Sequence, residues 1–179
     1  MKIVVSSAHL GVFPETFPSR DHIDWLPVDK LSKILVEILY SASNPTIGEE
    51  STTTTPAGTK TFHVVNPNTS SWSADLSADL VAAYEGGKVK PVPFEAWLEK
   101  LKASAKEAEI NGNVDVDSNP AIRLLEFYTT AVTSPEKGRQ LVPTAASEAS
   151  QTLRELGPLK PEWVKTWMAQ WGIGENVSA

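Results

Sequence analysis

Apolar side chains recur at helical spacing along most of this 179-residue chain, and this periodicity restricts the possible fold more than any other feature. The clearest run follows Asp29 and consists of Leu31, Ile34, Leu35, Ile38 and Leu39. Asp29 is placed to cap that helix, because its carboxylate can accept hydrogen bonds from first-turn amides. Further helices are predicted after Ser71 or Ser73, from Phe94 to about Ala108, from Asn119-Pro120, near 145–156 and from Pro161.

Strand signals are short and few. Residues 61–65 form an apolar run that ends at Asn66-Pro67, which predicts a buried strand. Residues 89–92 indicate an edge strand, because prolines interrupt that run. Residues 3–5 favour a strand by propensity, and the glycine and prolines of 11–18 then favour a loop. The expected fold class is therefore α+β, mostly helical, with two or three short strands and no complete Rossmann sheet.

The whole chain, 1–179, is expected to form a single domain. Residues 43–60 are polar and rich in threonine, so they offer no core and are predicted to be a flexible insertion. Residues 172–179 are expected to be a C-terminal tail.

Charge and composition exclude several classes of function. A net charge of −6 and a pI of about 5.1 argue against nucleic acid or an anionic membrane as partner. No cysteine is present, which excludes disulfides, thiolate metal sites and cysteine nucleophiles. The three histidines lack metal-ligand spacing, and no metal is predicted. Without a membrane-spanning run or a convincing signal peptide, the expected location is the cytoplasm.

Several blocks in order resemble one known family. They are Ser6-Ser7-Ala8-His9-Leu10-Gly11, Asp24-Trp25-Leu26-Pro27, His63-Val64-Val65-Asn66-Pro67, Val92-Pro93-Phe94, Asn119-Pro120-Ala121, Leu153-Arg154-Glu155-Leu156-Gly157-Pro158 and Trp167-Met168-Ala169-Gln170-Trp171. Together they are similar to the terminal thioester or carboxylate reductase domain of fungal non-ribosomal-peptide-synthetase-like (NRPS-like) enzymes, aminoadipate reductases and carboxylic acid reductases. The resemblance covers nearly the whole chain.

That family is an extended short-chain dehydrogenase, whose N-terminal Rossmann sheet holds NADPH and whose active site contains Tyr-x-x-x-Lys. The resemblance implies that this chain matches the C-terminal, substrate-side lobe. No Gly-x-x-Gly-x-x-Gly follows a strand here, and Tyr84 to Lys88 spells the active-site motif across two glycines that break a helical turn. We therefore expect no nicotinamide cofactor and no self-sufficient NADPH reductase activity.

The candidate site residues group around the second and third blocks of the resemblance. Trp25, His63, Asn66 and Trp72 are expected to line a substrate cleft, and His22, Asp24 and His63 are candidates for proton transfer. The favoured alternatives are structural: a solvated loop for Asp21, His22 and Asp24, a core or edge position for His63, and a turn at Asn66-Pro67. Trp163, Trp167 and Trp171 are expected to form a core-facing stripe.

Three classes of function remain open. The first is a stand-alone or truncated substrate-binding lobe in fungal specialised metabolism, which holds an apolar acyl, polyketide or terpenoid-like ligand without a cofactor. The second is a cofactor-independent cyclase, pericyclase or isomerase that works by positioning its substrate. The third is a non-catalytic module that docks a carrier protein or another partner. A homodimer through the face exposed by the missing Rossmann half is also possible.

Overall fold

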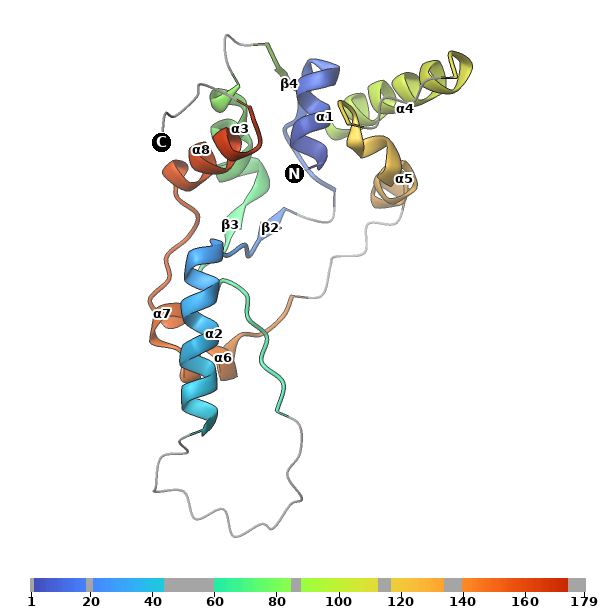
Figure 1. The fold of residues 1–179 in the computed structure, drawn as a ribbon. Coiled ribbons are helices and arrows are strands. Elements are labelled where there is room, and N and C mark those ends of the chain that lie inside the picture. Colours follow the sequence, from blue (N-terminus) through green and yellow to red (C-terminus); the bar gives the residue numbers. More distant parts are fainter. Residues whose placement is uncertain are drawn as a thin grey trace. The chain divides into compact units, whose positions relative to one another are not determined.

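A computed structural model describes residues 2–18, 21–43, 60–84, 88–112, 117–133 and 140–173. It is mostly helical with a few short strands, as expected for this α+β class (Figure 1). The chain divides into two compact units. Unit 1 comprises Met1–Ile23, Ser70–Gly138 and Leu159–Ala179, and unit 2 comprises Asp24–Thr69 and Arg139–Pro158. No helix in the described ranges has the length and apolar character needed to cross a membrane.

Unit 1 holds most of the regular structure. Its helical elements are α1 (Lys2–Leu10), the π-helical turn η1 (Trp72–Leu76), α3 (Ser77–Ala83), α4 (Phe94–Ile110), the 3-10 turn η3 (Pro120–Leu124), α5 (Leu125–Thr133) and α8 (Pro161–Gln170). Its strands are β1 (Val12–Pro14), β2 (His22–Ile23), β3 (Ser70–Ser71) and β4 (Lys90–Val92). β1 pairs with β4 in parallel, with Phe13 opposite Pro91, and β2 pairs with β3 antiparallel.

The first helix corrects a prediction made from local propensity. The apolar residues 3–5 favour a strand, but Lys2–Leu10 is helical. Its buried face carries Ile3, Val4, Ser6 and Ser7. Ser6 Oγ accepts from the Ala121 amide at 2.8 Å, and Ser7 Oγ accepts from Trp97 Nε1 at 3.0 Å. Tertiary packing thus outweighs the weak preference of β-branched residues for strands.

An aromatic cluster forms the centre of unit 1. Phe13 stacks on Trp72 with ring centroids 5.5 Å apart, and Phe94 packs on Trp97 at 5.6 Å. Tyr128 meets Trp97 edge-on at 5.1 Å, and its burial raises the pKa of its phenol to about 12. On α8 the buried residues are Val164 and Met168. The stripe expected of Trp163, Trp167 and Trp171 is only partly buried, and of these three Trp171 packs against the core cluster.

Unit 2 is built around α2 (Val28–Ser43), with α6 (Thr144–Ala149) and α7 (Gln151–Arg154) beside it (Figure 1). The helix predicted near 145–156 is thus two helices. Ser150, extended at φ −132°, separates them and caps α7 by accepting from the Leu153 amide. Asp29 lies in the first turn of α2 and is not its cap residue, because the helix already begins at Val28.

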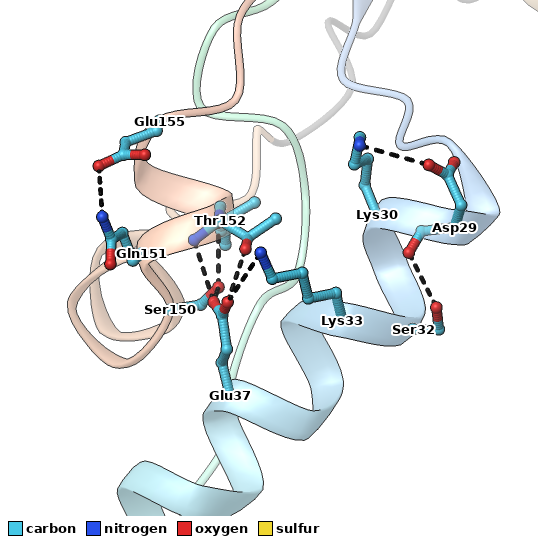
Figure 2. Close-up of polar contacts among 10 residues, drawn as sticks. Asp29, Lys30, Ser32, Lys33, Glu37, Ser150, Gln151, Thr152 and Glu155 are labelled. Carbon is cyan, nitrogen blue, oxygen red and sulfur yellow. Dashed lines mark hydrogen bonds and ion pairs between the residues drawn. The ribbon is translucent and has the colours of Figure 1, made fainter.

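A partly buried hydrogen-bond network attaches α2 to α7 (Figure 2). The Glu37 carboxylate accepts from Ser150 Oγ at 2.6 Å, from the Thr152 amide at 3.0 Å and from Thr152 Oγ1 at 2.6 Å. The Ser150 hydroxyl and then the Thr152 hydroxyl lower the pKa of Glu37 to about 2, because they stabilise the charged form.

Two further predictions have different outcomes. The predicted strand at 61–65 is wrong: the segment has no strand pairing in the structure. The insertion predicted at 43–60 and the tail at 172–179 lie almost entirely outside the described residues.

Candidate functional site

The predicted site residues lie on two segments of the chain, 22–25 and 63–72, and each segment has residues in both units. His22 and Trp72 belong to unit 1, whereas Asp24, Trp25, His63 and Asn66 belong to unit 2. Within unit 1, β2 pairs with β3, with Ile23 opposite Ser70. Ser70 Oγ also accepts from the Leu159 amide at 3.0 Å.

Within unit 2, Asn66 and Asn68 form hydrogen bonds to residues that are distant in the sequence, and we call these two residues the asparagine clasp. The Asn66 amide nitrogen of the main chain donates to Asp24 O at 3.0 Å, and its side chain donates to Gly157 O at 3.0 Å. Asn68 Nδ2 donates to Leu156 O at 2.6 Å, and its main-chain amide donates to Asn66 Oδ1. Asn66 is buried and all these groups are engaged inside the protein, which explains why an asparagine precedes Pro67.

The acidic group next to His22 also has a structural role. Asp21 Oδ1 accepts from the amide and hydroxyl of Ser73, and Asp21 Oδ2 accepts from Ser71 Oγ at 2.6 Å. These hydrogen bonds, that of Ser71 first, hold the pKa of Asp21 below its usual value. Ser71 Oγ in turn accepts from the Ala74 amide, which confirms Ser71 as the cap of the following helix.

The four residues expected to line a cleft lie in different environments. Trp72 is 3% exposed in the core of unit 1, and its Nε1 donates to Pro14 O at 3.0 Å. Trp25 is 37% exposed in unit 2, where His63 is also exposed. Asn66 and Trp72 are therefore fixed by internal contacts, whereas Trp25 and His63 present surface to solvent. The exposed His22 lies in β2, and the main-chain oxygen of Asp24 accepts from Asn66.

Tyr84 has no catalytic environment. It is 5% exposed, its hydroxyl donates to Val4 O at 2.7 Å, and burial raises the pKa of its phenol. A phenol held in this way supports the core of unit 1. This buried position is consistent with the interpretation of Tyr84 to Lys88 as a chance match to Tyr-x-x-x-Lys.

Unit 2 contains a hollow of about 320 Å³ with mainly apolar walls, which we call the apolar pocket. Its lining consists of Pro67, Pro143, Thr144, Ser147, Glu148 and Arg154. Pro67 belongs to the block in which a ligand contact was predicted, but its neighbours come from α6 and α7. Sequence reasoning missed Ser147, which has no motif around it; Arg154 had a signal, because it lies in the sixth block of the resemblance.

The hydroxyl of Ser147 makes this pocket unusual. Ser147 Oγ is buried, and no group in the described part of the chain forms a hydrogen bond with it. An unsatisfied buried hydroxyl costs about 1–3 kcal/mol, so such groups are rare in proteins. The pocket thus combines an apolar wall, one unused hydroxyl, and an acid and a base that are both exposed.

Unit 1 contains a second hollow of about 270 Å³, which we call the polar pocket. Its polar lining is His9, Ser104, Glu107, Asn111 and Asn119. Asn119 is 1% exposed, and its Oδ1 is the other buried side-chain atom without a partner among the described residues. His9 and Asn119 both lie in blocks of the resemblance. In the described part of the chain, no group of three or more acidic, histidine or cysteine side chains could hold a metal ion.

Comparison with known proteins supports the resemblance seen in the blocks. No protein-family model matches the chain. It is 37% identical over 175 residues to a carboxylic acid reductase of Neurospora crassa, which covers 96% of this chain and 15% of the relative. It is 28% identical to the citrinin polyketide synthase of Monascus ruber, covering 94% of this chain and 6% of the relative. It is 25% identical to the adenylate-forming reductase Nps11 of Serpula lacrymans, covering 94% and 15%.

This chain therefore spans only a small part of the length of the relatives it matches. It resembles one region of the fungal NRPS-like reductases, a region that also occurs in polyketide synthases.

Proposed function

We propose that this chain is the substrate-side lobe of an acyl or thioester reductase region in fungal specialised metabolism, and that it holds the acyl group of the substrate. The observation that carries the proposal is the 37% identity to a carboxylic acid reductase over 96% of the chain. Other relatives are named an adenylate-forming reductase and a 3-methylorcinaldehyde synthase, and the latter name contains an aldehyde. Reduction of an activated acyl group gives an aldehyde, so these names are consistent with one shared step.

The apolar pocket is the place we propose for the acyl group. Its volume of about 320 Å³ is at the lower end of the range for small-molecule sites. Burial of an apolar acyl chain against Pro67 and Pro143 would supply most of the binding free energy. A rotation of the Ser147 side chain would let its buried Oγ donate a hydrogen bond to the carbonyl oxygen of the acyl group, and the guanidinium of Arg154 at the pocket lining favours an electron-rich oxygen.

In this proposal the chain binds its ligand without nicotinamide. The 179 residues contain no Gly-x-x-Gly-x-x-Gly motif that could approach a pyrophosphate through main-chain amides. Hydride transfer would then depend on a dinucleotide-binding part outside this sequence, and the lobe would orient the acyl carbon.

A thioester probe tests the proposal directly. The benzoyl thioester of N-acetylcysteamine is titrated into the purified chain and followed by calorimetry. Thr144→Trp places a large side chain at the exposed edge of the pocket and should weaken binding at least tenfold, about 1.4 kcal/mol. Thr166→Trp is the matched control, because Thr166 is exposed on α8 and does not line the pocket.

Both variants should keep the melting temperature of the parent within about 2 °C, since surface changes usually alter stability little. Equal affinity of the parent and Thr144→Trp would remove the apolar pocket from the proposal. Absence of any saturable binding to the parent would contradict acyl recognition by this lobe.

A second function, docking of a protein partner, is favoured by an exposed apolar stripe on α2. Val28, Leu35 and Leu39 are spaced at i, i+7 and i+11, so they share one helix face, and they are 80%, 46% and 67% exposed. Sedimentation equilibrium tests whether a second copy covers this stripe. If the parent is a dimer and Leu39→Glu dissociates it, the stripe is assigned to self-association. If the parent and Leu39→Glu are both monomers, self-association through the stripe is excluded.

A further inference from the structure

The polar pocket of unit 1 lies at the ends of two helices. His9 is in the last turn of α1, and Asn111 is the C-cap residue of α4. The C-terminal end of a helix carries the negative end of its dipole and favours cations. The last turn of the 17-residue α4 contains no basic side chain that could neutralise this end.

One face of α4 adds a formal negative charge to the same place. Ser104, Glu107 and Asn111 are spaced at i, i+3 and i+7 and line the pocket together with Ala108. Glu107 forms no ion pair among the described residues. On the same helix Lys102 pairs with Glu99 at 2.8 Å and does not line the pocket.

Asn119 supplies an acceptor that the protein itself leaves unused. Its Nδ2 donates to Ser104 Oγ at 3.1 Å, which orients the amide, while its buried Oδ1 receives no hydrogen bond. Asn111 and His9, which border the pocket, are both exposed, so small rotations of these side chains can open a path to this oxygen. A pocket lined by a buried acceptor, a carboxylate and residues from two helix C-terminal ends favours a ligand that is positively charged and carries N–H donors.

We propose that the polar pocket binds a primary ammonium group, with Glu107 supplying the counter-charge and Asn119 Oδ1 accepting one of its N–H donors. Ile122 and Ala108 form the apolar part of the lining and would contact the carbon attached to the nitrogen. This site lies in unit 1 and does not rest on acyl binding by the apolar pocket of unit 2.

The test uses n-propylammonium chloride and the ¹⁵N-labelled chain. The amide signals of Ser104 and Asn119 are followed during the titration, at constant ionic strength maintained with sodium chloride. We expect saturable shifts with a Kd on the order of 1–10 mM. 1-Propanol, which has no charge, and tetramethylammonium, which has no N–H donor, should bind at least about tenfold more weakly.

Matched variants separate the pocket from general charge effects. Glu107→Gln should weaken binding of propylammonium about tenfold, whereas Glu109→Gln, an exposed change on the same helix outside the lining, should leave the Kd unchanged. Asn119→Leu should abolish saturation, with its melting temperature recorded to show that the chain is folded.

The proposal is overturned if the parent shows no saturable shift or if 1-propanol shifts the same signals equally. It is also overturned if the two glutamate variants weaken binding to the same extent. A folded Asn119→Leu variant that binds like the parent would remove Asn119 from the site and refute the role assigned to its oxygen.

Discussion

The side-chain amide of Asn66 donates a hydrogen bond to the main-chain oxygen of Gly157, which lies 91 residues further along the chain, at a distance of 3.0 Å. Asn66→Leu keeps the branching and the number of side-chain heavy atoms but breaks this bond and the one from the Asn68 amide. We expect a loss of about 1–3 kcal/mol in the free energy of unfolding, because buried partners are left unsatisfied. Urea denaturation followed by circular dichroism measures this loss.

Asn68→Leu is the graded control for that experiment. It removes the bond to Leu156 O but leaves the contacts of Asn66 in place. The loss should therefore be smaller than for Asn66→Leu. An equal or larger loss would contradict the central position we assign to Asn66 in the clasp.

Glu37 should make the free energy of unfolding depend on pH. The pKa of this carboxyl is about 2 in the folded chain against an ordinary value of 4.5, so its stabilising contribution is complete above about pH 5. That contribution is lost as the pH falls through 4.5 towards 2, because the unfolded chain takes up the proton first. The side chain is 26% exposed, so we expect a loss of about 2 kcal/mol, less than full burial would give.

The measurement is urea denaturation at pH 6 and pH 3 for the parent and for Glu37→Gln. The variant should be less stable than the parent at pH 6 and should lose less stability between the two values. If both proteins lose the same amount, other carboxylates, such as Asp21, dominate the acid response.

Two neighbouring residues on α2 should respond in opposite ways to the same substitution. Ile38 is 6% exposed and Leu39 is 67% exposed. Ile38→Glu buries a charge and should cost more than about 4 kcal/mol, whereas Leu39→Glu should change stability by less than about 0.5 kcal/mol. Thermal unfolding of both variants decides this. A large loss for Leu39→Glu would show that its side chain is covered in solution.

The helices that the sequence predicts best are those whose signals are local. The run after Asp29 and the segment from Phe94 both form helices, since the spacing of their apolar residues can be recognised within a few turns. Of the two caps predicted for the next helix, Ser71 and Ser73, the structure has Ser71. Asn119-Pro120 also opens a helical segment as expected, with the proline in its first turn.

The failures concern structure that depends on distant residues. The glycine and prolines of 11–18 favour a loop, yet β1 forms there and pairs with β4, 78 positions away, at Val12 and Lys90. Residues 61–65 have the composition of a strand but find no partner among the described residues. A strand exists only through its neighbour, so propensity alone could neither predict the first nor exclude the second.

The candidate site also has a part that the sequence predicts and a part that depends on distant residues. The blocks of the resemblance contain Pro67, Arg154, His9 and Asn119, and each of these lines one of the two pockets. Which residues of a block face a pocket depends on packing. Trp72 was expected to contact a ligand, but its ring stacks on Phe13 in the core.

The packing of α8 against α3 has a consequence for the order in which the protein can fold during its synthesis. Val164 and Met168 belong to the same buried cluster as Val4 and Phe13, so the unit that contains the first helix receives its last core residues late. All segments of unit 2 have been translated by Pro158. On the ribosome, where domains usually fold from the N-terminus onward, the whole sequence of unit 2 is therefore available before that of unit 1, and α1 cannot complete its core until α8 has been synthesised.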